Sequence, residues 1–188
     1  MIHLFALLSL LLCGVCYTGF QNSSHFHNTS NRRSLLLLVF GGALLLRLLL
    51  AYTTHGLSND IACFAAWADR IFTLGPGQFY SAEMFTDYPP GFMYVLYLIG
   101  ALRSLLQIPY YSDLHILLLK LPAILCDIAC GFLLYREAVK RLHFSDLQGI
   151  FAASAYLFQP AVILNSSCWG QVDSVYTLMI ILMCLFLM

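Results

Sequence analysis

Long apolar runs alternate with shorter polar stretches along this chain. The apolar runs fall at about residues 2–20, 35–52, 91–107, 114–135, 149–164 and 174–188. A helix needs about 20 predominantly apolar residues to cross the hydrocarbon core of a bilayer, so several of these runs have the length of a membrane span. The pattern predicts an all-α protein, a polytopic helix bundle embedded in a lipid bilayer.

Composition agrees with this interpretation. Hydrophobic residues make up 61% of the 188 residues and charged residues only 10%, whereas a soluble domain carries about 25% charged residues. The formal net charge is zero and the chain has no basic stripe. This balance argues against nucleic acid as a partner.

Two polar segments interrupt the apolar pattern and are the places where a function is expected. The first, residues 53–90, holds four of the nine acidic residues: Asp60, Asp69, Glu83 and Asp87. The second, Trp169–Asp173, lies between the last two apolar runs. Carboxylates beside a bilayer are costly unless water solvates them or the protein uses them.

Basic residues predict the orientation of the chain, because short cytoplasmic loops are enriched in Lys and Arg. They form two clusters, one before the second apolar run and one after the fourth: Arg32, Arg33, Arg136, Lys140 and Arg141. If both clusters are cytoplasmic, the runs 35–52 and 114–135 cross in opposite directions and no full span lies between them. Residues of about 53–112 then form one long external loop.

The run 91–107 lies within this loop and carries further signs that it does not span. It is short, follows Pro89-Pro90 and contains Arg103. Irregular segments are tolerated in a membrane where they line a cavity, and amphipathic helices lie along the interface. We therefore expect amphipathic or re-entrant helices in the loop. The alternative, a full span, would place the second basic cluster outside.

With this topology the run 149–164 crosses outward, so that Asp60, Asp69, Glu83, Asp87 and Asp173 share the external compartment and could converge there. Three of them, Asp60, Asp87 and Asp173, also have a purely structural explanation. Asp60 opens a helix expected over 60–74, where it is either a capping residue or a general base kept ionised by the helix end. Asp87 starts a turn before two prolines, and Asp173 can cap the last helix.

Asp127 lies in the middle of a predicted span. A carboxylate there is costly and should face other helices, where Lys120 or Arg47 can pair with it as a polar lock. Alternatively, these two cations extend toward the membrane surface, or one of them binds a lipid phosphate.

Five segments in this order carry a resemblance to a known family. They are Ser58–Asp60, Gly77–Tyr80, Thr86–Gly91, Leu119–Pro122 followed by Asp127, and Asn165–Ser174. With them, residues 35–188 resemble the amino-terminal part of the GT-C superfamily of membrane glycosyltransferases that use polyprenyl-phosphate sugars. The likeness is to bacterial relatives of the dolichyl-phosphate-mannose mannosyltransferases and of the lipid-linked oligosaccharide glucosyltransferases.

The resemblance implies a division of the chain. Residues 1–34 would be a hydrophobic anchor with a cytoplasmic loop, and residues 35–188 a partial GT-C-like transmembrane module. The family's carboxy-terminal spans are absent, and the last apolar run ends at Met188 without a polar tail. We therefore expect a fragment truncated at the C-terminus.

The resemblance also implies a reaction: transfer of a hexose, mannose or glucose, from a polyprenyl-phosphate donor to a hydroxyl of an acceptor glycan, lipid or protein. It would occur on the outer face of a bacterial plasma membrane, with inversion and with Asp60 as the base. Lys120 or Arg103 would offset the charge of the leaving phosphate. The sugar and acceptor would be bound by Asp87, Tyr88, Trp169, Gln171 and Asp173.

Many members of the family carry a paired acid in the first loop, whereas Asp60 follows Asn59 and precedes Ile61. This departure favours a single carboxylate and no metal or other cofactor. The alternative to the enzyme is a non-enzymatic polytopic membrane protein, transporter-like or a scaffold, or an inactive fragment of the enzyme.

Overall fold

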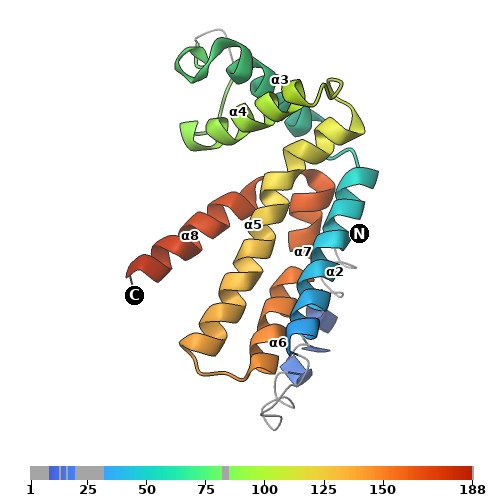
Figure 1. Ribbon diagram of the computed structural model, residues 1–188, viewed down its shortest axis with the longest axis vertical. Coiled ribbons are helices and arrows are strands. Elements are labelled where there is room, and N and C mark those ends of the chain that lie inside the picture. The colour runs from blue at the N-terminus through green and yellow to red at the C-terminus, as the bar shows by residue number, and fades with distance from the viewer. Residues whose placement is uncertain (1–8, 13, 16, 20–31, 82–84, 188) are drawn as a thin grey trace.

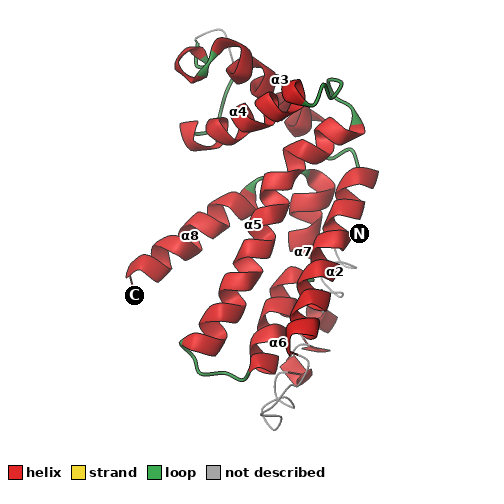
Figure 2. Cartoon of the chain, in the orientation of Figure 1, coloured by secondary structure: helices red, strands yellow, loops and turns green. Residues whose placement is uncertain are grey.

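The computed structural model describes residues 9–12, 14–15, 17–19, 32–81 and 85–187, and none of these lies in a strand (Figure 2). Glu83 and much of the expected anchor over 2–20 lie outside the described residues. From residue 32 onward the α-helices are α2 Arg32–Thr53, α3 Ser58–Leu74, α4 Pro90–Leu105, α5 Asp113–Lys140, α6 Asp146–Leu157, α7 Pro160–Ile163 and α8 Asp173–Leu187. Two shorter elements are the 3₁₀ helix Pro76–Gln78 and the π-helix η2, Leu164–Trp169.

Three helices, α2, α5 and α6, lie side by side and form a bundle (Figure 1). Helix α5 is capped by Ser112, whose side chain accepts a hydrogen bond from the backbone N–H of His115. Helix α6 begins with a capping box in which Ser145 and Gln148 satisfy each other's backbone N–H groups. Both caps set where the polypeptide enters the bundle.

Two helices, Arg32–Thr53 and Asp113–Lys140, are long and apolar enough to cross a membrane. A third span exists if Asp146–Leu157 and Pro160–Trp169, which are bent by 50° relative to each other, count as one broken helix. The bend falls at Pro160, which cannot donate the backbone hydrogen bond of a continuous helix. The prediction of an all-helical chain with membrane-length helices is thus confirmed for the described residues.

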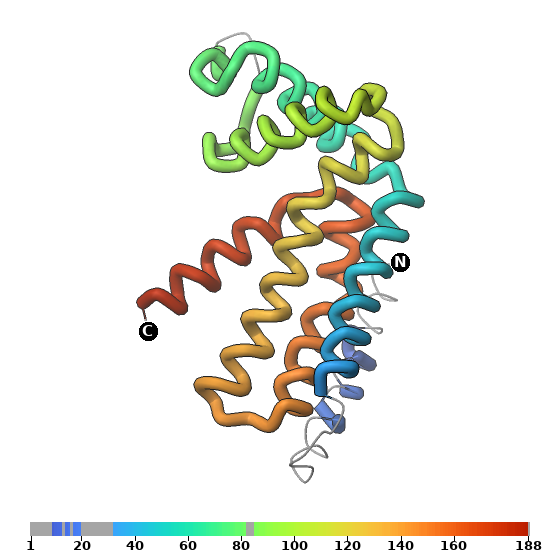
Figure 3. Tube along the Cα trace, viewed as in Figure 1, coloured from blue at the N-terminus to red at the C-terminus, as the bar shows by residue number. Residues whose placement is uncertain are grey.

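Helices α3 and α4 form a second layer that crosses one end of the bundle (Figures 1 and 3). Helix α3 covers the helix expected over 60–74, and α4 covers the run 91–107 up to Leu105. The two helices approach closely at Gly100, where a Cβ atom would lie 2.5 Å from the backbone oxygen of Ala68. The re-entrant or interfacial position of α4 stays a prediction.

A buried carboxylate joins four helices inside the bundle. Asp127 of α5 is fully buried and accepts hydrogen bonds from Arg47 Nε of α2 at 3.3 Å, Tyr156 of α6 at 3.2 Å and Ser174 of α8 at 2.5 Å. The expected polar lock is therefore present, with Arg47 as the partner. Neither cation extends to the surface, because Arg47 and Lys120 are both fully buried.

Candidate functional site

The candidate site lies at the end of the bundle where α2 stops, α3 starts and η2 leads into α8. The backbone N–H of Leu57 donates to the backbone oxygen of Trp169 at 2.9 Å and joins the two polar segments identified in the sequence. Two glycines with φ of 80°, Gly56 and Gly170, allow this contact. A Cβ atom on Gly56 would lie 2.8 Å from the Trp169 oxygen, and one on Gly170 would lie 2.6 Å from Ile61 Cδ1.

Asp60 lies in the first turn of α3, near amide groups that lack intrahelical partners. The cap position belongs to Leu57, which makes no side-chain capping bond. The half-buried Asp60 side chain instead accepts a hydrogen bond at Oδ2 from Gln171 Nε2. Its other oxygen, Oδ1, has no hydrogen-bond partner in the described part of the chain, and is therefore available to a bound molecule.

The charges of three carboxylates act on the phenol of Tyr88. Burial raises the pKa of Tyr88 to about 12, with further contributions from Tyr176 and from Asp60, Asp87 and Asp173. Negative charges act on a phenol in this way only from nearby. Three of the five acids predicted to share one compartment are thus close enough to act on one phenol, whereas Asp69 pairs with Arg103 and Glu83 lies outside the described residues.

Two of these carboxylates also act on the thiol of Cys63, which lies one helical turn beyond Asp60 in α3. Burial raises the pKa of Cys63, and the charges of Asp60 and Asp87 raise it further. Cys63 also lines a groove of about 480 Å³ along α3, together with Trp67, Arg70 and Ser81. The groove thus runs along α3 from about one turn beyond Asp60, and none of the three carboxylates lines it.

Lys120 of α5 contacts the two helix ends on which the site is built. Its ammonium group lies within hydrogen-bond distance of four backbone oxygens, those of Ala51 at 3.2 Å, Thr54 at 2.6 Å, Ser167 at 3.0 Å and Cys168 at 3.4 Å, and donates its three N–H groups among them. These oxygens lie at the ends of α2 and η2, where unpaired carbonyl groups attract a cation. Lys120 therefore ties the two helix ends together, and in this arrangement it has no surface with which to bind a phosphate.

Arg103, the second candidate for the phosphate, lies away from the site. Its guanidinium pairs with Asp69 at 2.7 Å and donates to the backbone oxygen of Ile108 at 3.2 Å. Asp69 follows Asp60 by nine residues in α3, which is about 13 Å along a helix axis. Arg103 thus fixes the far ends of α3 and α4 to each other.

The remaining predicted residues occupy the site in different ways. Gln171 orients Asp60, and Trp169 contributes a backbone oxygen and a side chain that is 43% exposed. Asp173 is exposed and accepts a hydrogen bond from Asn165 Nδ2 at 2.8 Å. Asp87 is exposed just before α4.

Two members of the site, Cys63 and Tyr176, were not predicted from the sequence. Each follows a site carboxylate by three residues, the spacing that places side chains on one helix face. Asn165 was singled out only as the first residue of the segment Asn165–Ser174, and its contact with Asp173 depends on the π-helical turn between them. Among residues 32–81 and 85–187, no three His, Cys, Asp or Glu side chains come together as metal ligands. Catalysis without a metal stays a prediction.

Comparisons of the chain with models of protein families, with curated proteins and with solved structures find no match. In the part of the chain that the structure describes, the fold is all-helical, with two or three membrane-length helices and a cluster of carboxylates at one end of the bundle. That cluster is the feature of the molecule from which a function can be inferred.

Proposed function

We propose that this chain is a multi-pass membrane glycosyltransferase module of the GT-C type. It transfers a hexose, mannose or glucose, from a polyprenyl-phosphate donor to an acceptor hydroxyl at the outer face of a bacterial plasma membrane. The observation that carries the proposal is the meeting of the two polar segments where the membrane-length helices end, with Gln171 hydrogen-bonded to Asp60 and Asn165 to Asp173. A donor with its lipid tail in the bilayer and its sugar in water would place the bond between sugar and phosphate at the membrane surface, close to these carboxylates.

Asp60 is the base of the proposed reaction. Gln171 holds its Oδ2, so Oδ1 faces the acceptor hydroxyl and takes its proton as the hydroxyl oxygen attacks the anomeric carbon. The bond between that carbon and the phosphate oxygen breaks, and the polyprenyl phosphate leaves with the electron pair. One displacement inverts the anomeric centre. General-base assistance of this kind contributes about 10²–10⁴-fold to the rate.

The other groups position the substrates. Asp87 and Asp173 accept hydrogen bonds from sugar or acceptor hydroxyls, and the rings of Tyr88 and Trp169 supply apolar surface. The groove beside Cys63 has the volume of a small-ligand site and gives the acceptor a place about one turn beyond Asp60. Lys120 acts as a positioning residue, because its ammonium group is already bound by backbone oxygens.

The position of the ionisable groups favours this enzyme over a transporter. A transporter places its ionisable residues near the bilayer midplane, in broken helices. Asp127, the acid nearest the middle of α5, is buried and fully bound by Arg47, Tyr156 and Ser174. The acids without such partners lie at the end of the bundle.

The proposal is tested by an in vitro transfer assay with radiolabelled polyprenyl-phosphate mannose and polyprenyl-phosphate glucose. We expect the Asp60→Asn substitution to lower kcat by about 10²-fold or more, because the amide cannot take a proton. Asp113→Asn is the matched control. Asp113 is an exposed acid at the same end of the bundle, in the first turn of α5, and contacts none of the site residues.

Near-wild-type turnover of Asp60→Asn would remove Asp60 from the base role. An equal loss in Asp113→Asn would show that the assay responds to charge at this end of the protein and not to the base. Transfer that stops on addition of a chelator would replace the single-carboxylate mechanism with a metal-dependent one.

A further inference from the structure

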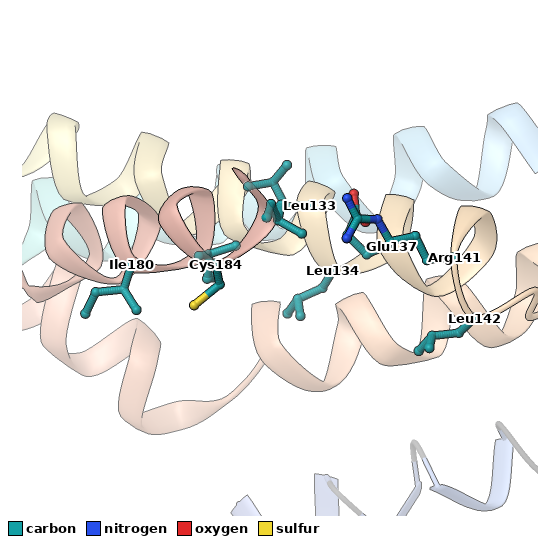
Figure 4. A pocket seen from close by; sticks show the side chains of 9 residues that line it. Leu133, Leu134, Glu137, Arg141, Leu142, Ile180 and Cys184 are labelled. Atoms are coloured by element: carbon teal, nitrogen blue, oxygen red, sulfur yellow. The ribbon is translucent and has the colours of Figure 1, made fainter. Parts of the chain in front are cut away.

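A second cavity lies at the opposite end of α5 from the carboxylates. Helix α8 leads away from α5 toward its C-terminal end (Figure 1), and a groove of about 330 Å³ lies between the two helices. Figure 4 shows its walls, formed by Leu133 and Leu134 of α5 and by Ile180 and Cys184 of α8. The groove is apolar along its length.

The end of the groove carries an excess of positive charge. Glu137 and Arg141 line it there (Figure 4), and Glu137 is shared between Arg136 at 2.6 Å and Arg141 at 2.8 Å. With Lys140, this last stretch of α5 has three cations and one carboxylate. Arg141 uses only Nε for Glu137, and its two terminal nitrogens have no hydrogen-bond partner within the described ranges. An anion can therefore bind at the mouth of the groove.

The groove is separate from the candidate active site. Residue 137 follows Lys120 by seventeen residues, about 25 Å along a helix axis. In the orientation predicted from the basic clusters, the mouth lies at the cytoplasmic face, where anionic lipid headgroups attract Lys and Arg. The apolar walls then run into the hydrocarbon region.

We propose that this groove is a binding site for an anionic phospholipid. One acyl chain lies between α5 and α8 along Leu133, Leu134 and Ile180, and the lipid phosphate accepts hydrogen bonds from the free nitrogens of Arg141. Charge complementarity selects the headgroup, because Glu137 alone does not neutralise the three cations and the ammonium of a zwitterionic headgroup would offset the charge of its phosphate. The site does not depend on the glycosyltransferase activity proposed above.

Native mass spectrometry of the purified chain tests this inference. The detergent-solubilised protein is titrated with dioleoyl phosphatidylglycerol or dioleoyl phosphatidylcholine, and the bound lipids are counted. We expect one retained phosphatidylglycerol at concentrations where phosphatidylcholine is lost. Arg141→Gln should weaken its retention about fivefold, the factor expected for one Arg contact with an anionic headgroup. Lys140→Gln, which removes the same charge outside the groove, should weaken it less.

A pair of neighbouring substitutions tests the acyl-chain position. Ile180 lines the groove, whereas Met179 does not, and the two are equally exposed at 57% and 59%. Ile180→Trp fills the groove and should abolish the retained lipid, while Met179→Trp should keep it. Because both replacements are at exposed positions of one helix, both variants are expected to fold.

Three results would overturn the inference. Equal retention of the two lipids would remove the headgroup selectivity, and equal retention by Ile180→Trp and Met179→Trp would move the lipid out of the groove. A dimer that Ile180→Trp disrupts and phosphatidylglycerol leaves unchanged would show that a second copy of the chain occupies the groove.

Discussion

Gly170 and Lys120 together set the position of Gln171 relative to Asp60. Lys120 holds the backbone oxygens that end η2, and Gly170 then turns the chain with φ of 80° and ψ of 26°. The backbone N–H of Gln171 returns to the oxygen of Asn165 at 2.9 Å. Gln171 is thus fixed through its main chain, and its amide can orient the Asp60 carboxylate.

We expect Gly170→Ala to destabilise the protein and to lower transfer. A left-handed conformation costs an alanine about 1–3 kcal/mol, and the new Cβ atom would meet Ile61 Cδ1 and Lys120 Cγ. The control is Gly75→Ala, because Gly75 also has a positive φ, 82°, but has open space around it. Thermal midpoints in detergent should fall for both variants, while the transfer assay should fall further for Gly170→Ala. Equal transfer by the two variants would contradict the positioning role.

For individual residues, the sequence predicted which of them gather at the site better than it predicted the role of each one. The acids and the segment Trp169–Asp173 could be placed together, because helix ends and basic clusters constrain which side each lies on. The role of Lys120 could not be predicted, since its partners are backbone oxygens at the ends of two helices that are distant in sequence. Nothing in the local pattern indicates that those ends meet.

Among the elements, α5 organises the bundle because one of its residues binds three other helices. The Asp127 carboxylate is held by side chains of α2, α6 and α8, and Arg47 also donates to the backbone oxygen of Ala43 at 3.3 Å. Burying an ion pair costs desolvation energy, so the pair specifies how the helices meet more than it stabilises them. Ser174 follows Asp173, so the lock also fixes where α8 leaves the site.

A double-mutant cycle tests this role. Arg47→Met leaves Asp127 as an uncompensated buried charge, and Asp127→Leu does the same to Arg47, so each should lower the stability by about 3–5 kcal/mol. The double variant Arg47→Met/Asp127→Leu leaves no buried charge and should recover most of the loss, measured by denaturation in detergent. A double variant as unstable as the sum of the single variants would show that the two side chains act independently.

The helices themselves were largely predictable from the apolar runs. The runs 35–52 and 114–135 correspond to α2 and α5, and Pro89-Pro90 precedes or begins α4 as its turn chemistry predicts. The run 149–164 differs, because it contains a 50° bend at Pro160 and then passes into a π-helix. Pro122 lies inside α5 without ending it. Sequence alone does not distinguish these two prolines, since the difference depends on how neighbouring helices pack.

Over the whole molecule, charge is divided between the two ends of the bundle. Arg32 at the start of α2 pairs with Asp146 at the start of α6 at 3.3 Å, and α5 ends at Lys140 on the same side. The two basic clusters that sequence analysis assigned to the cytoplasm therefore lie at one end (Figure 1). Asp60, Asp87 and Asp173 lie at the other. This separation supports a membrane orientation with the carboxylates outside.

Single cysteine substitutions, made in a variant whose seven native cysteines are replaced, test the membrane orientation directly. Asp87→Cys and Asp173→Cys should react with a membrane-impermeant maleimide in intact cells, because both positions are exposed at the carboxylate end. Lys140→Cys, exposed at the basic end, should react only after the membrane is permeabilised. Reaction of positions 87 and 173 from opposite faces would separate the carboxylates that act on Tyr88 and remove the shared site. If position 140 reacts in intact cells while positions 87 and 173 are protected, the site stays intact but lies at the cytoplasmic face. The sugar donor would then bind at the cytoplasmic face and the anionic lipid at the outer face.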